Sequence, residues 1–141
     1  MQTKYIEYNL LRHTLKGNQY LDPTYWQQME IVRTELTIKA SLAVKLCGNF
    51  LEPIYSKDDV LLIQTQPSVE EGELGMFHVG GLAYIMVYHK DRLCSVNPDY
   101  PDIPIREEIY CRGKVIGKLN PDELLQSFGF KPTLKQEPAL E

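Results

Sequence analysis

Short apolar or alternating segments recur along the chain from residue 42 onward. Segments of this length, separated by turn-forming residues, are typical of strands in an all-β domain. They are Leu42–Cys47, Val60–Thr65, Met76–Val79, Leu82–Tyr88, Arg92–Val96 and Ile109–Leu119. We therefore expect a mostly β domain over residues 36–119.

Glycines refine this expected sheet at two places. Gly80-Gly81 lies between two strand-like segments and fits a two-residue hairpin turn. Gly113 interrupts the long segment Ile109–Leu119, which indicates a β-bulge or a strong bend. Long, bent strands suit a small, curled, barrel-like sheet.

A short C-terminal helix is expected over residues 121–128, inside a segment that spans residues 120–130. Asn120 is a good N-cap, Pro121 suits the first helical position, and Gly129 is a good helix end. Leu124, Leu125 and Phe128 would then share one face, packed on the sheet or on a second subunit. Residues 131–141 are polar and contain two prolines, so we expect a loose tail there.

Residues 1–35 form an N-terminal segment whose structure the sequence leaves open. Tyr25–Val32 fits a helical turn or a strand, and Trp26 fits a core or interface anchor. The segment is too short and too irregular for the several helices of a helix-turn-helix domain.

Length and charge limit the possible functions. A chain of 141 residues supports one domain with a substantial core. Its net charge of −4 lacks the basic excess that binding to phosphates requires, so we do not expect this chain to bind DNA by itself. The sequence shows neither a membrane span nor a signal peptide, and we expect a cytoplasmic protein.

The cysteines and histidines do not form a recognisable site. Cys47, Cys94 and Cys111 are widely spaced within apolar segments, which predicts inert, buried free thiols. The histidines His13, His78 and His89 lack the paired spacing of zinc ligands. We expect neither a metal site nor a cofactor.

The segment Gly48-Asn49-Phe50-Leu51-Glu52-Pro53 has the form of a known catalytic loop. It resembles the Gly-Asp-Ser-Met-Glu-Pro loop of the LexA-like family, which includes phage CI-type repressors. Further segments match this family at the expected distances. They are Tyr55–Ile63, Val69–Gly75, Gly80–Tyr88, Arg92–Pro101 and Val115–Lys118. The most specific of them is Arg92–Pro101, which contains Asn97-Pro98 and Tyr100. The resemblance covers roughly residues 15–119.

The resemblance implies the C-terminal domain of a repressor that cleaves its own chain with a serine and a lysine. In this sequence Phe50 stands at the serine position and Met86 at the lysine position. Lys16-Gly17 stands where the family has its cleavage site, usually an Ala-Gly pair. Gly48, Glu52, Pro53, Asn97, Pro98 and Tyr100 match motif positions for which we expect structural roles.

Phenylalanine has no attacking oxygen and methionine has no proton-accepting nitrogen, so both agents of acyl transfer are lost together. Losing a member of such a catalytic unit costs roughly 10⁴ to 10⁶ in rate. We expect that Phe50 and Met86 have turned the catalytic slot into packing. The alternative is that another pair acts, with a serine from Ser41, Ser56 and Ser95 and a lysine from Lys45, Lys57 and Lys90.

Three functions remain open at this stage. The first, which the resemblance favours, is a non-catalytic homodimerisation domain of a phage-repressor-like transcription regulator, with its helix-turn-helix domain outside this chain. The second is a module that binds a peptide or an antirepressor in the former cleft, and the third is an active self-cleaving peptidase. A peptide-binding cleft would be disfavoured if the chain's own N-terminal segment filled it.

Overall fold

The computed structural model describes residues 1–106 and 108–129. It contains one sheet of eleven strands in the order β11-β3-β1-β4-β5-β10-β6-β7-β8-β9, with β2 paired to β1. The strands are β1 (Thr3–His13), β2 (Gln19–Leu21), β3 (Gln27–Val32), β4 (Leu42–Leu46), β5 (Val60–Thr65), β6 (Leu74–Val79), β7 (Leu82–Tyr88), β8 (Arg92–Cys94), β9 (Ile103–Pro104), β10 (Ile109–Lys118) and β11 (Leu124–Gly129). Two 3₁₀ turns, η1 (Thr37–Lys39) and η2 (Pro121–Glu123), complete the elements. The prediction of a mostly β fold is confirmed.

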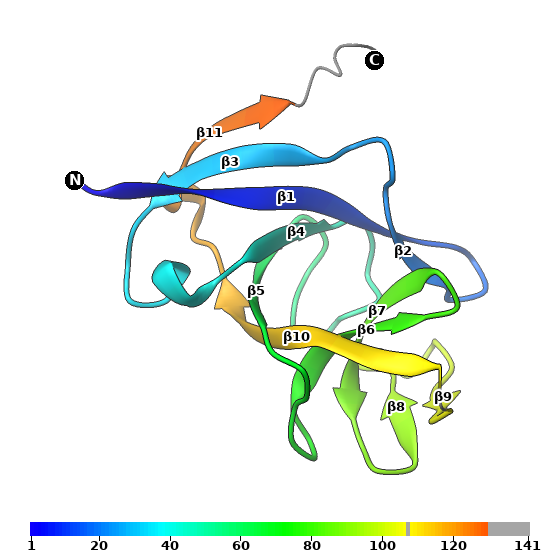
Figure 1. The fold of residues 1–141 in the computed structure, drawn as a ribbon. Helices are drawn as coiled ribbons and strands as arrows, with labels where there is room; N and C mark the ends of the chain where they lie inside the picture. Colours follow the sequence, from blue (N-terminus) through cyan, green and yellow to red (C-terminus); the bar gives the residue numbers. More distant parts are fainter. Residues whose placement is uncertain (107, 130–141) are drawn as a thin grey trace.

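The sheet is strongly curled but does not close into a barrel, because β11 and β9 stand at opposite ends of the strand order. Figure 1 shows β1, β3 and β11 on one side of the molecule and β6 to β9 on the other, with β5 and β10 running between them. Only β1 and β4 pair in parallel among the described strands, and all other pairs are antiparallel.

The N-terminal segment is part of this sheet. β1 pairs with both β3 and β4, which places it in the interior of the strand order. The open question over Tyr25–Val32 is answered by a strand, β3, in which Met29 and Ile31 are fully buried at period-two spacing. Trp26 packs against the core and lies 5.9 Å, ring centroid to guanidinium carbon, from Arg112.

The prediction of a C-terminal helix over residues 121–128 is wrong beyond the first turn. The cap signals do act, since the Glu123 carboxylate accepts a hydrogen bond from the Asn120 backbone N–H at 3.0 Å and η2 follows. From Leu124 the chain instead pairs with β3 as β11. An isolated helix of about eight residues is only marginally stable, whereas the edge of β3 offers backbone partners along its length. The expected tail, residues 131–141, and residue 130 lie outside the described residues.

Both glycine-based predictions are confirmed. Gly80 and Gly81 have φ values of 55° and 85° and join β6 to β7, with Val79 paired to Leu82. The register of β10 against β6 shifts between Cys111 and Gly113, as a β-bulge requires. A Cβ atom at Gly113 would collide with the backbone carbonyl of Gln64 on β5, so this close approach of two strands needs glycine.

Three hydrophobic clusters fill the two faces of the curled sheet. The central cluster contains Leu11, Leu42, Val44, Leu46, Phe50, Leu51, Leu61, Ile63, Met76, Ile85 and Val115. The second cluster contains Ile6, Tyr8, Met29, Ile31, Ala40, Ala43, Leu62 and Leu119. The third cluster contains Val69, Phe77, Tyr84, Met86 and Leu93. Because side chains alternate along a strand, one strand supplies residues to two clusters.

The three cysteines differ from expectation in their burial. Cys47, Cys94 and Cys111 are free, but each is partly exposed rather than buried, because each lies at or near a strand end or bulge. Burial of part of each side chain raises the pKa of the Cys47 and Cys111 thiols. Within residues 1–106 and 108–129, no group of three or more His, Cys, Asp or Glu side chains could hold a metal ion. No helix in the same ranges has the length and hydropathy needed to cross a membrane.

Candidate functional site

The nucleophile loop, Gly48–Pro53, follows β4 and turns its central side chains into the core. Phe50 is 1% exposed and Leu51 is fully buried, and both belong to the central cluster. The loop is a tight turn in which the Glu52 N–H donates to the Asn49 carbonyl at 3.1 Å. The peptide bond between Glu52 and Pro53 is cis, and both of these side chains are exposed. The position that bears the nucleophile in the LexA-like pattern therefore holds a buried aromatic ring.

His13, at the end of β1, covers this loop. Its ring centroid lies 5.1 Å from that of Phe50 and 5.7 Å from that of Tyr100. A Cβ atom at Gly48 would collide with the His13 ring, so glycine is what lets the histidine approach the loop backbone. No motif in the sequence indicates that this histidine lies beside the loop.

The Asn97–Tyr100 segment is joined to the nucleophile loop by hydrogen bonds. The Asn97 side-chain amide donates to the Asn49 carbonyl at 2.8 Å, and the Tyr100 hydroxyl donates to Asn49 Oδ1 at 2.8 Å. Asn97 Oδ1 also accepts the Asp99 N–H at 2.9 Å, which closes a turn around Pro98. These contacts position the loop and leave Asn97 and Tyr100 without an evident chemical task.

Met86 does not share the environment of Phe50. On β7, Tyr84 and Met86 belong to the third cluster, whereas Ile85 between them belongs to the central cluster with Phe50. Adjacent residues of a strand point to opposite faces of the sheet, so Ile85 and Met86 face opposite sides. The expected packing of Phe50 against Met86 is therefore wrong. Ile85, fully buried, is the β7 residue on the Phe50 side.

The Lys16-Gly17 pair lies in the turn between β1 and β2. The Gly17 N–H donates to the Thr14 carbonyl at 3.0 Å, and Gly17 has a φ of 94° that favours glycine. A Cβ atom at Gly17 would lie 3.0 Å from the Pro101 ring and 3.2 Å from the Tyr100 ring. The Lys16 side chain is exposed and has no polar partner within the described part of the chain.

The residues after this turn attach the N-terminal segment to β7. Gln19, 3% exposed, accepts the Ile85 backbone N–H with its side-chain oxygen at 2.8 Å. The Tyr84 hydroxyl donates to Asn18 Oδ1 at 3.1 Å. Figure 1 shows β2 beside β7. The chain's own segment thus lies against the strand that would carry the catalytic lysine, which disfavours a cleft open to another peptide.

Two of the alternative serines, Ser41 and Ser95, have other side-chain partners. Ser41 Oγ lies 2.6 Å from Thr65 Oγ1, and Ser95 Oγ donates to the Asn97 carbonyl at 2.9 Å. At Ser56 the backbone N–H donates to Asp59. No hydrogen bond joins any of these serines to Lys45, Lys57 or Lys90 in the described ranges. A serine needs an adjacent base to act as a strong nucleophile.

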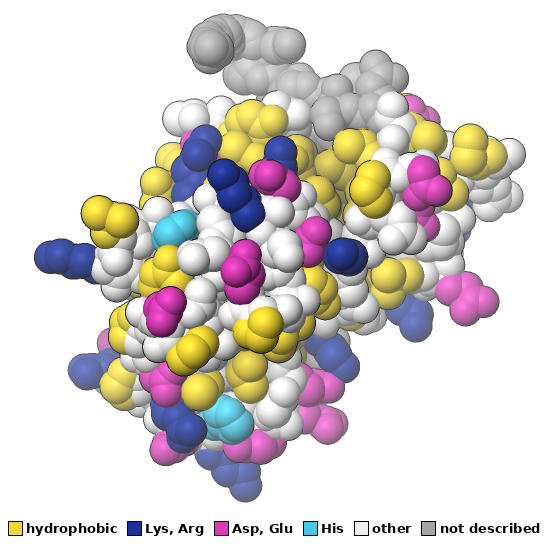
Figure 2. Space-filling model, turned by 180° about the vertical axis from the view of Figure 1, so that it is seen from behind, with side chains coloured by type: hydrophobic (Ala, Val, Ile, Leu, Met, Phe, Trp, Pro, Cys, Tyr) yellow, Lys and Arg dark blue, Asp and Glu magenta, His cyan; other side chains and the backbone are white. Residues whose placement is uncertain are grey.

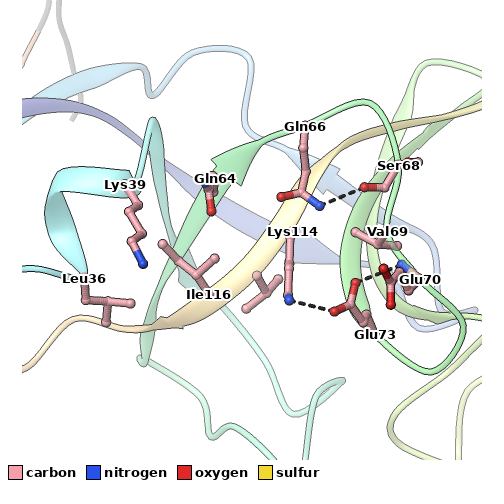
Figure 3. A pocket seen from close by; sticks show the side chains of 11 residues that line it. Leu36, Lys39, Gln64, Gln66, Ser68, Val69, Glu70, Glu73, Lys114 and Ile116 are labelled. Carbon is pink, nitrogen blue, oxygen red and sulfur yellow. Dashed lines mark hydrogen bonds and ion pairs between the residues drawn. The ribbon is translucent and has the colours of Figure 1, made fainter.

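A hollow of about 560 Å³ lies away from the Gly48–Pro53 loop, between η1, β5, β10 and the start of β6. In Figure 3, Lys114 points to Glu73, and the two side chains are 2.6 Å apart. Glu73 also accepts the Glu70 N–H, and the Gln66 amide donates to the Ser68 carbonyl. None of its lining residues belongs to the nucleophile loop or to the β1–β2 turn. This hollow is separate from the predicted site.

The fold is a curled, mostly β sheet in which the Gly48–Pro53 loop carries the buried Phe50 ring. The model of the Peptidase S24-like family matches residues 17–118, so the chain belongs to this family. This confirms the resemblance to LexA-like and CI-type domains. None of the curated proteins matches the sequence.

Replacing Phe50 by alanine tests how far this ring supports the fold. We expect Phe50→Ala to lower the free energy of unfolding by about 3 to 5 kcal/mol, because it removes a fully buried aromatic ring. Phe50→Leu should cost less than about 1.5 kcal/mol. Urea denaturation measures both. Ile54→Ala, in the same segment but 59% exposed, is the matched control and should change stability by less than about 0.5 kcal/mol. A Phe50→Ala variant as stable as this control would contradict the burial of the ring.

Replacing Gln19 tests the attachment of the β1–β2 turn to β7. Gln19→Ala leaves the buried Ile85 N–H without its acceptor, which should cost about 1 to 3 kcal/mol. Amide hydrogen exchange at Ile85 should accelerate more than exchange at Leu62 on β5. Lys16→Ala, at an exposed side chain of the same turn with no polar partner in the described part of the chain, is the control and should leave the exchange rate unchanged. Unchanged protection of the Ile85 amide would show that the segment is not held there by Gln19.

Proposed function

We propose that this chain is a non-catalytic domain of the Peptidase S24-like family that dimerises a repressor-like transcription regulator. The regulator contacts DNA through a helix-turn-helix domain outside this chain, and it acts in the cytoplasm. The observation that carries the proposal is the Phe50 side chain, 1% exposed at the nucleophile position. Acyl transfer requires an activated oxygen or sulfur at this place, and a phenyl ring supplies neither.

The surroundings of Phe50 support the loss of catalysis. Ile85 faces the same cluster from β7, so both the nucleophile and base sides of the former site are apolar. The base in such a pair is a desolvated lysine, whose amine accepts the proton. Ile85, the β7 residue on the Phe50 side, has no proton-accepting group. Packing has taken the place of the catalytic pair even though Met86 itself faces the other cluster.

The end of the sheet supports dimerisation. β11 is the terminal strand of the strand order and pairs only with β3 among the described strands. An edge strand carries backbone groups that a second chain can pair with. Leu124 and Leu125, at the start of β11, are 39% and 40% exposed. We propose that two copies associate along this edge, with these leucines buried in the contact.

The surface charges support an indirect role at DNA. Figure 2 shows Lys and Arg side chains interspersed with Asp and Glu side chains over the face it presents. With a net charge of −4, such a surface lacks the continuous basic region that neutralises phosphates. A dimer of this domain would instead hold two DNA-binding domains on paired half-sites, which raises the effective concentration of the second domain.

Intact mass after prolonged incubation at alkaline pH tests the loss of self-cleavage. We expect the 16.3 kDa chain to remain whole, because neither the nucleophile nor the base is present. Fragments that begin at Gly17 would contradict the proposal if their rate of formation is independent of protein concentration, as intramolecular cleavage requires. A rate that falls on dilution would identify a contaminating protease as the cause.

A further inference from the structure

Tyr8 on β1 is a buried polar side chain that the proposed function does not use. It is 7% exposed, belongs to the second cluster, and packs edge-on against Tyr25 with ring centroids 6.1 Å apart. Its hydroxyl makes no hydrogen bond with any described residue. Leaving a buried hydroxyl without a partner is costly. Burial also raises the pKa of Tyr8, so the group stays a neutral donor at physiological pH.

Tyr8 lines a hollow of about 290 Å³ that opens at the ends of β4, β5 and β10. This volume is at the small end of the range for ligand sites, which begins at about 300 Å³. Part of the lining is apolar and comes from Val60, Leu119, Pro121 and Leu124. The hollow is separate from the nucleophile loop, since none of the loop residues lines it.

Two lysines and two aspartates supply the charges of this hollow. Lys45 Nζ lies 3.8 Å from Asp58 Oδ1, and Lys118 Nζ lies 3.7 Å from Asp59 Oδ1. Both separations exceed the range of about 2.7 to 3.2 Å for an N–H···O hydrogen bond, so the ammonium groups keep donors for another partner. Asp58 is held at a φ of 74°, an uncommon conformation for a residue other than glycine.

The balance of charges selects among ligands. A simple anion would be attracted by the lysines but repelled by the carboxylates of Asp58 and Asp59. A simple cation would be attracted by the carboxylates but repelled by the lysines. A zwitterion satisfies both signs at once. The apolar lining adds a place for an aliphatic side chain, and the buried hydroxyl adds a directed hydrogen-bond donor.

We propose that this hollow binds a small zwitterion with an aliphatic side chain, that is, an α-amino acid of the leucine type. Its carboxylate accepts hydrogen bonds from the Tyr8 hydroxyl and from Lys45 or Lys118. Its ammonium group faces Asp58, and its side chain lies on Val60, Leu119 and Leu124. Leu124 also lies in the proposed dimer contact, so the two proposals share this residue, whereas Tyr8 and Asp58 lie outside β11 and their variants test the ligand site alone.

Titration of the full chain with L-leucine, followed by the backbone amide shifts of Val60 and Leu119, tests the proposal. We expect saturable binding in the unmodified chain and a loss of affinity of about tenfold in Tyr8→Phe, which removes only the hydroxyl. Asp58→Asn should weaken binding similarly, and asparagine tolerates the same backbone conformation. Tyr110→Phe, a matched change at an exposed tyrosine outside the hollow, should bind as the unmodified chain does.

Two probes that carry one charge each complete the test. Isocaproate has the carboxylate and side chain of leucine without its amine, and isoamylamine has the amine without the carboxylate. Both should bind at least about tenfold more weakly than L-leucine. The proposal is overturned if L-leucine does not bind the folded chain, if Tyr8→Phe binds it undiminished, or if isocaproate binds equally well. The last result would identify an anion site.

Discussion

Burial of the Phe50 ring is the interaction on which the arrangement of the Gly48–Pro53 loop depends. The ring joins the loop after β4 to a cluster built from β1, β4, β5, β6, β7 and β10. His13 packs on its outer side, and Gly48 leaves room for that histidine. Asn49 is held by Asn97 and Tyr100. These contacts fix the loop, and the Phe50 side chain contributes to the packing of the core.

The N-terminal segment is the second part of this arrangement. β1 lies inside the strand order between β3 and β4, and the following turn is attached to β7 through Gln19. In the LexA-like pattern this turn would be the substrate, and here it remains next to the strand that faces Phe50. The segment thus contributes to the folded sheet.

The sequence predicted features that depend on local chemistry. The Gly80-Gly81 hairpin and the bulge at Gly113 follow from glycine placed within period-two segments, and both are present. The family motifs also predicted the Peptidase S24-like family, whose model matches residues 17–118. The C-terminal helix failed because good capping residues at Asn120 and Pro121 say nothing about the free edge of β3, a partner distant in the sequence. The same non-local pairing placed residues 3–32 in the sheet.

The prediction that Met86 packs with Phe50 failed because of the direction of one side chain on β7. A motif match identifies the strand, but it does not decide on which face of the sheet a side chain lies. Val79 pairs with Leu82 in this hairpin, and Ile85 rather than Met86 lies on the Phe50 side. Counting alternate positions from the Gly80-Gly81 turn shows that these two residues face opposite ways, although not which face is the core of the site. His13 could not be found from sequence, because its place near Phe50 depends on the pairing of β1 with β4.

Sedimentation equilibrium of the full chain over a wide concentration range tests most directly whether this domain forms a homodimer. The account predicts a dimer that persists on dilution to micromolar concentrations. It also predicts that Leu125→Asp, at the β11 edge, shifts the population to monomer, whereas Ile54→Asp, at an exposed position outside that edge, does not. A chain that stays strictly monomeric at high concentration would contradict the account.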